Sequence, residues 1–100
     1  MAAPFHEWLA LRDRIEQARL DFIETDLGVL LTFAAIVETQ YNMGNREHAE
    51  RTLAEAEKGY FILLRMFSKA NGLTPELEVK FQLTFKHLRE RLDGLKRLGR

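Results

Sequence analysis

Three histidines are the residues of this sequence best suited to bind a metal or transfer a proton. They are His6, His48 and His87, in three separate stretches. His87 and Glu90 are three residues apart, so on a helix both project from one face and could supply two metal ligands. A di-metal helical bundle, however, needs Glu-x-x-His pairs and further carboxylates from several helices. Because one reversed pair in a basic stretch falls short of that set, we expect no metal site.

Closely spaced carboxylates are the second possible source of chemistry. The pairs are Glu47 with Glu50, Glu55 with Glu57, and Glu76 with Glu78. Acid–base catalysis needs two carboxylates in contrasting environments beside a cleft. The first two pairs are instead interleaved with Arg46, Arg51 and Lys58, a pattern typical of surface ion pairs on a helix. Ser68 is the only serine, and no glycine-rich phosphate loop occurs. We therefore expect no enzyme, no catalytic residue, no cofactor and no small-molecule substrate.

Composition limits the possible classes of protein further. One hundred residues make one domain, and 46% hydrophobic with 30% charged residues indicate a globular chain. The absence of cysteine excludes disulfides, zinc–thiolate sites and thiol nucleophiles, and it fits a reducing cytoplasm. The most apolar stretch, residues 27–37, is far shorter than the roughly 20 residues that span a bilayer. The N-terminus has no signal-peptide pattern. We expect a cytoplasmic protein with no membrane partner.

The formal charge is zero, but it is unevenly distributed. Residues 1–26 hold six acids and three arginines, whereas residues 74–100 hold seven basic and four acidic residues. Either an acidic first stretch lies beside a basic last helix, or the basic end binds nucleic acid through Arg89, Arg91 and Arg97. A sequence pI near 6.8 lacks the strongly basic footprint of nucleic-acid binders, which favours the first interpretation.

Apolar residues recur with helical spacing along most of the chain. The pattern predicts helices at about 5–23, 26–43, 46–70 and 75–98, and no strands. Thr25 and Asp26 give an N-cap signal between the first two, although one continuous helix stays open. Gly44 is expected in the left-handed conformation with Asn45 as the next N-cap. Thr74-Pro75-Glu76 starts the last helix. The fold class predicted is an all-α antiparallel bundle of three to four helices in one domain.

Two of these helices carry more apolar residues than one packed face requires. Residues 27–37 are apolar almost all round. Residues 46–70 hold a heptad seam that includes Ala49 and Ala56, where we expect the closest helix approach, and further apolar residues beside it. Left uncovered, they favour a symmetric dimer. Some of the first set are expected to remain uncovered, together with residues of the second helix; the candidates are Leu30, Leu31, Phe33, Ala34 and Val37, and Phe61, Ile62, Leu64 and Met66. The alternative is that residues 5–23 fold back as a lid, with Trp8 as a partly exposed candidate for a binding hot spot.

One hairpin has a spacing that is known from a repeat family. Ile36, Gly44, Asn45, Ala49, Leu53 and Ala56 match a packing aliphatic, the turn pair and the small and large packing residues of one repeat. Residues 30–58 therefore resemble a single degenerate tetratricopeptide repeat. Phe33, Val37 and Phe61 depart from its pattern. The resemblance implies a concave binding face on the first helix, at Leu31, Ala34, Glu38, Tyr41 and Asn42. Members of this family that bind carboxylates use Lys, Arg and Asn at several of these positions. Leu31, Ala34 and Glu38 do not supply such side chains, so an acidic peptide terminus is not the expected ligand.

Taken together, these observations favour a non-enzymatic module for protein–protein interaction or self-association, built on the repeat-like hairpin. The partner expected is another protein or a second copy, most simply in a homodimer. Two alternatives stay open. One is a small nucleic-acid-associated regulator that uses the basic residues 86–100, and the other is a small ligand-binding helical bundle.

Overall fold

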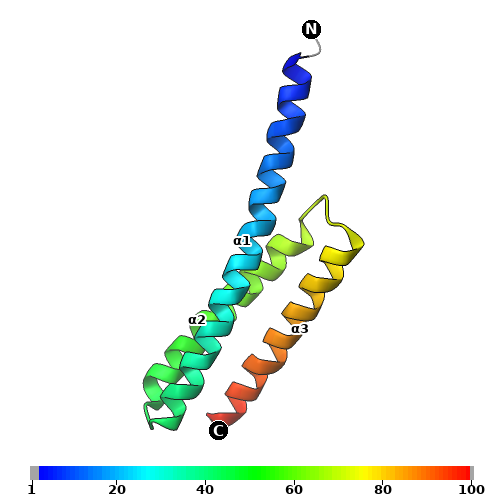
Figure 1. Cartoon of the computed structure of the whole chain (residues 1–100). Coiled ribbons are helices and arrows are strands. Elements are labelled where there is room, and N and C mark those ends of the chain that lie inside the picture. Colours follow the sequence, from blue (N-terminus) through cyan, green and yellow to red (C-terminus); the bar gives the residue numbers. More distant parts are fainter. Residues whose placement is uncertain (1–2, 100) are drawn as a thin grey trace.

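The structure, a computed structural model, describes residues 3–99 and confirms the all-α class. Three helices follow one another: α1 (Ala3–Asn42), α2 (Arg46–Ser68) and α3 (Pro75–Leu98). Figure 1 shows that α2 returns along α1 and that α3 then runs back beside both, so neighbours in sequence are antiparallel. No strand occurs within residues 3–99. The predicted start and end of the last helix, 75 and 98, are confirmed, whereas α2 ends two residues before the predicted 70.

α1 is a single helix of 40 residues, so the predicted break between helices 5–23 and 26–43 is wrong. Thr25 and Asp26 favour helix ends, but neither interrupts a helix as proline does. Buried apolar residues continue across the predicted break with steps of three and four, at Ile23, Leu27 and Leu30. Packing of this continuous face outweighs the local capping signal.

The turn between α1 and α2 has the predicted chemistry. Gly44 has φ +76°, and Asn45 occupies the N-cap position, although its side chain makes no capping hydrogen bond. Ala49 and Ala56 are fully buried. At Gly59 the two helices lie so close that an added Cβ would come within 2.9 Å of Leu30 Cδ2. The α1–α2 hairpin is therefore tightly packed along its length.

The core lies between the three helices and is entirely apolar among the described residues. Its largest fully buried side chains are Ile23, Leu27, Val37, Leu88 and Leu92. α3 begins as predicted, because the Thr74 hydroxyl accepts a hydrogen bond from the Leu77 N–H at 3.2 Å and Pro75 sits in the first turn. α3 thus closes the third side of the hairpin.

The first half of α1 extends past the rest of the molecule (Figure 1). Leu20 is the first buried residue among residues 5–42, and we call residues 3–19 the overhang and residues 20–42 the bundle half. At 1.5 Å per residue the overhang is about 25 Å long. The radius of gyration is 17.6 Å, against about 13 Å for a compact chain of this length. The alternative in which residues 5–23 fold back as a lid is therefore wrong.

Candidate interaction surface

A continuous row of exposed residues follows one face of α1 over both of its halves. The residues are spaced alternately by three and four, which places them on one side of a helix. All are exposed, and we call them the outer seam: Trp8, Leu11, Ile15, Ala18, Phe22, Thr25, Val29, Thr32, Ile36 and Thr39. Exposure of the large apolar members ranges from 57% at Trp8 to 41% at Ile36. α1 therefore offers a partner one continuous exposed row of mainly apolar residues.

A second row, on nearly the opposite side of α1, packs against α2 and α3. We call it the inner seam: Leu20, Ile23, Leu27, Leu30, Ala34, Val37 and Tyr41. At 3.6 residues per turn the two seams are about 150° apart. α1 therefore has one face for its own bundle and a separate face that no described residue covers.

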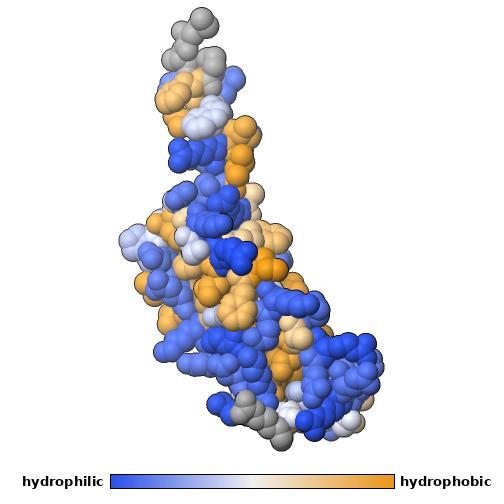
Figure 2. Space-filling view, turned by 180° about the vertical axis from the view of Figure 1, so that it is seen from behind, coloured by the Kyte–Doolittle hydropathy of each residue, from blue (hydrophilic) through white to orange (hydrophobic). Residues whose placement is uncertain are grey.

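A groove borders the outer seam in the bundle half. It has a volume of about 340 Å³ and lies between α1 and α2, where Phe22, Val29 and Phe33 face Ile62. Asp26 and Glu55 also line it. Figure 2 shows apolar surface on the overhang and again over the middle of the molecule, amid hydrophilic side chains. The groove widens the apolar surface that the seam presents.

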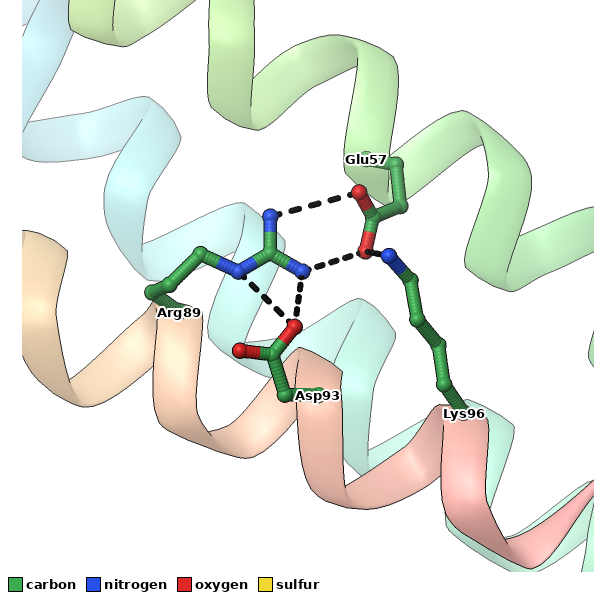
Figure 3. Close-up of polar contacts among 4 residues, drawn as sticks. All are labelled: Glu57, Arg89, Asp93 and Lys96. Carbon is green, nitrogen blue, oxygen red and sulfur yellow. Dashed lines mark hydrogen bonds and ion pairs between the residues drawn. The ribbon is translucent and has the colours of Figure 1, made fainter.

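A network of charged side chains joins α2 to α3 (Figure 3). Arg89 donates to both carboxylate oxygens of Glu57, at 3.2 and 2.6 Å, and to Asp93 at 2.6 Å. Lys96 approaches Glu57 at 3.0 Å. The Arg89 guanidinium also lies over the Tyr60 ring, 4.9 Å from its centroid. The network clamps the two helices and leaves the Glu57 carboxylate fully engaged.

These contacts shift the pKa values of three groups in the network. Burial raises the pKa of Glu57, but the hydrogen bonds from Arg89 and Lys96 outweigh it, so the pKa lies below its ordinary value. The hydrogen bond from Arg89 likewise lowers the pKa of Asp93, and the bond to Glu57 raises the pKa of Arg89. A carboxylate held ionised by two cations is a poor general base, so this network has a structural role.

The predicted concave residues of the repeat-like hairpin lie on the side of α1 that α3 covers. Ala34 is fully buried and Leu31 is half-buried against the core. Glu38 accepts a hydrogen bond from Arg91 of α3 at 2.9 Å. The Tyr41 hydroxyl lies so close to Gly99 that a Cβ there would come within 2.7 Å of it, while Asn42 is exposed at the end of α1. Leu31 and Ala34 thus pack in the core, Glu38 contacts α3, and Tyr41 contacts the residue that follows α3.

Of the five candidates for an uncovered patch on residues 30–37, only two stay partly exposed. Leu30, Ala34 and Val37 belong to the core, and Leu31 and Phe33 are half-buried. Phe61 and Ile62 are exposed as predicted, whereas Leu64 and Met66 are half-buried. The apolar surface instead follows the outer seam, of which the predicted patch contains no residue and of which Trp8 alone was predicted to be exposed. Its heptad spacing from 8 to 39 is the signal that could have located it.

Two of the three arginines proposed for nucleic-acid contact, Arg89 and Arg91, are engaged with acids of this chain, whereas Arg97 is exposed. Arg89 and Lys96 pair with Glu57, Arg91 pairs with Glu38, and Lys80 pairs with Glu24. Among the side chains that the structure describes, no three histidines or carboxylates gather into a metal-binding group. Within residues 3–99, none of the helices combines the length and apolar character that a membrane crossing requires.

Comparison with protein-family models, curated proteins and solved structures gave no match. The resemblance of residues 30–58 to a tetratricopeptide repeat therefore stays a prediction. The exposed residues of the chain itself are the basis for a proposal about its function.

Proposed function

We propose that this chain is a non-enzymatic protein-interaction module whose docking surface is the outer seam of α1. The observation that carries the proposal is the unbroken exposure of the seam from Trp8 to Ile36, over residues inside and outside the bundle. The hairpin that resembles a tetratricopeptide repeat serves here as the support that holds α1 straight. Its concave positions, covered by α3, are not the docking face in this proposal.

The physical support is the cost of leaving such a helix bare. The overhang exposes Phe5, Trp8, Leu11 and Ile15, each at more than half of its area. An isolated helix of 12–15 residues is only marginally stable in water, and most helical stability in proteins comes from packing an apolar face. A partner that buries the seam stabilises the overhang and removes this apolar surface from water.

Photo-crosslinking in cells that produce the intact chain tests the proposal. A benzophenone-bearing amino acid replaces Leu11 on the outer seam, and in a matched variant it replaces Leu83 on α3, which is similarly exposed at 62%. We expect irradiation to give a discrete polypeptide adduct from position 11 and none from position 83. The adduct is resolved on a denaturing gel and identified by mass spectrometry.

Each result has a definite meaning. An adduct from position 11 with any polypeptide, including a second copy, supports a docking role for the seam. The absence of adducts at position 11, or equal adducts at both positions, contradicts it.

A further inference from the structure

We infer that the partner of the outer seam is a second copy of this chain, packed antiparallel so that each overhang lies along the bundle half of the other. This inference rests on the proposed function and names its partner. The two seams overlap completely when residue numbers of facing positions add to about 47, with Phe22 opposite Thr25 of the other copy. A two-fold axis then crosses α1 near residues 22–25, and the assembly closes on itself.

The sizes of the seam residues specify the antiparallel orientation. The first position of each heptad is large, with Trp8, Ile15, Phe22, Val29 and Ile36. The second is mostly small, with Leu11, Ala18, Thr25, Thr32 and Thr39. In an antiparallel pair each first position faces a second position, so nearly every layer combines a large and a small side chain. A parallel pair instead sets large on large and small on small, which overpacks some layers and leaves gaps in others.

Two of the three seam threonines suit a buried layer because their hydroxyls are already satisfied within α1. Thr32 Oγ1 donates to the Gly28 carbonyl at 3.1 Å, and Thr39 Oγ1 donates to the Ala35 carbonyl at 3.1 Å. Thr32 and Thr39 can therefore present their methyl groups to the partner without leaving a buried polar group unpaired.

Charges beside the seam favour the same orientation. In the parallel pair, Arg14 meets Arg19 of the other copy and Asp21 meets Asp26, so two like-charge contacts stand against one unlike pair, Glu7 with Arg12, on each side of the interface. In the antiparallel pair, Arg19 meets Asp26 of the other copy, and the remaining flanking charges face neutral residues. Opposite charges at these flanking positions set orientation in helix pairs. Asp26 has no ion-pair partner among residues 5–99, and Arg19 has only a 3.5 Å contact with Glu16.

The surface available is sufficient for a stable dimer. The chain exposes 7106 Å², about 1,200 Å² more than the roughly 5,900 Å² expected for a compact protein of this mass. A standard interface buries about 800 Å² on each partner. In the antiparallel pair, each overhang would lie beside the groove of the partner, which is lined by Phe22, Val29 and Ile62. The extra exposed area therefore lies where the two copies would meet.

Sedimentation of the intact chain with a charge swap is the first test. We expect a mass of two chains, where one chain is 11.7 kDa. Arg19→Glu alone and Asp26→Arg alone each place like charges opposite each other and should weaken association at least about tenfold. The double variant R19E/D26R restores unlike pairs and should dimerise again. Lys86→Glu, an exposed charge reversal on α3, is the matched control and should leave the mass unchanged.

Disulfide trapping tests orientation, and the chain offers a clean background because it has no cysteine. Ala18 and Val29 of two antiparallel copies face each other. A mixture of Ala18→Cys and Val29→Cys chains should form disulfide-linked dimers between unlike chains, and neither variant alone should do so. Leu83→Cys is the control for random collision.

The outcomes separate this inference from the proposed function. Efficient disulfides in each single variant alone indicate a parallel pair and overturn the inference. A single-chain mass that stays constant up to about 100 μM, far above the 1 μM range of moderate affinities, also overturns it. The proposed function then survives if position 11 crosslinks to a different polypeptide, and falls if it crosslinks to none.

Discussion

The two halves of α1 share one outer seam but differ on the opposite side. In the bundle half the inner seam is apolar and buried, from Leu20 to Val37. Continued into the overhang with the same spacing, it meets Glu16, Asp13 and Leu9. The overhang is therefore not built to extend its own bundle, yet it keeps the apolar outer seam at Trp8, Leu11 and Ile15. The inner seam serves folding and stops where the bundle stops, whereas the outer seam continues, and the proposed docking role explains this difference.

Truncation of one leucine in each half of α1 should give the largest difference in stability between the two halves. Leu27→Ala removes a side chain that is 2% exposed, and it should lower the free energy of unfolding by about 2–5 kcal/mol. Leu11→Ala, at 54% exposed, should change it by less than about 0.5 kcal/mol. Urea unfolding is measured at a dilution where the sedimented mass is that of one chain. A loss at Leu11 as large as at Leu27 would mean that the overhang packs on its own bundle.

Substitution by proline should have different effects on stability in the two halves of α1. Ala35→Pro and Ala10→Pro replace exposed alanines, one in each half. In the bundle half, loss of the backbone hydrogen bond and the ring clash should cost about 3 kcal/mol. In the overhang, only the first turns should unwind, leaving the melting temperature of the bundle unchanged. Circular dichroism reports both the helix content and the melting temperature. Equal losses of stability in the two variants would show that α1 folds as one cooperative unit.

Local signals in the sequence predicted the α1–α2 turn and the start of α3, whereas the break inside α1 and the two faces of α1 were not predicted correctly. Gly44 and the Thr74-Pro75 start specify backbone conformation directly, so the hairpin turn and the start of α3 were predictable. The all-round apolar stretch 27–37 hid two faces, because the inner and outer seams overlap there. Which of Leu30 and Val29 is buried depends on where α2 and α3 pack. The concave residues of the repeat-like hairpin were likewise covered by α3, a contact that no local pattern specifies.

Acid should weaken the contact between α2 and α3, because the titrating network lies there. The pKa of Glu57 is depressed below its ordinary value of 4.5, so its stabilising effect is present above that value and is lost as the pH falls through the lower, folded value. Glu57→Gln should cost about 1 kcal/mol at pH 7. The difference from the parent chain should shrink toward zero as the pH falls through the folded pKa. Urea unfolding across this range measures it, and a pH-independent difference would contradict the ionic origin.

The smallest effect should appear at Glu16, where the inner seam turns polar and the overhang begins. The Glu16 carboxylate accepts a hydrogen bond from the backbone N–H of Asn71 at 3.2 Å and lies 3.5 Å from Arg19. It is therefore the contact by which the α2–α3 loop holds the base of the overhang.

Glu16→Gln keeps the shape of the side chain and removes its charge, which for a surface contact costs a few tenths of a kcal/mol. The Asn71 amide should then exchange with solvent about twofold faster, measured by NMR, because local opening becomes that much easier. Glu24→Gln, which weakens the 3.1 Å pair with Lys80 one turn or two deeper in the bundle, is the control and should leave Asn71 unchanged. If exchange at Asn71 responds equally to both variants, the loop is held by the bundle as a whole, and the boundary between the halves of α1 lies elsewhere than at Glu16.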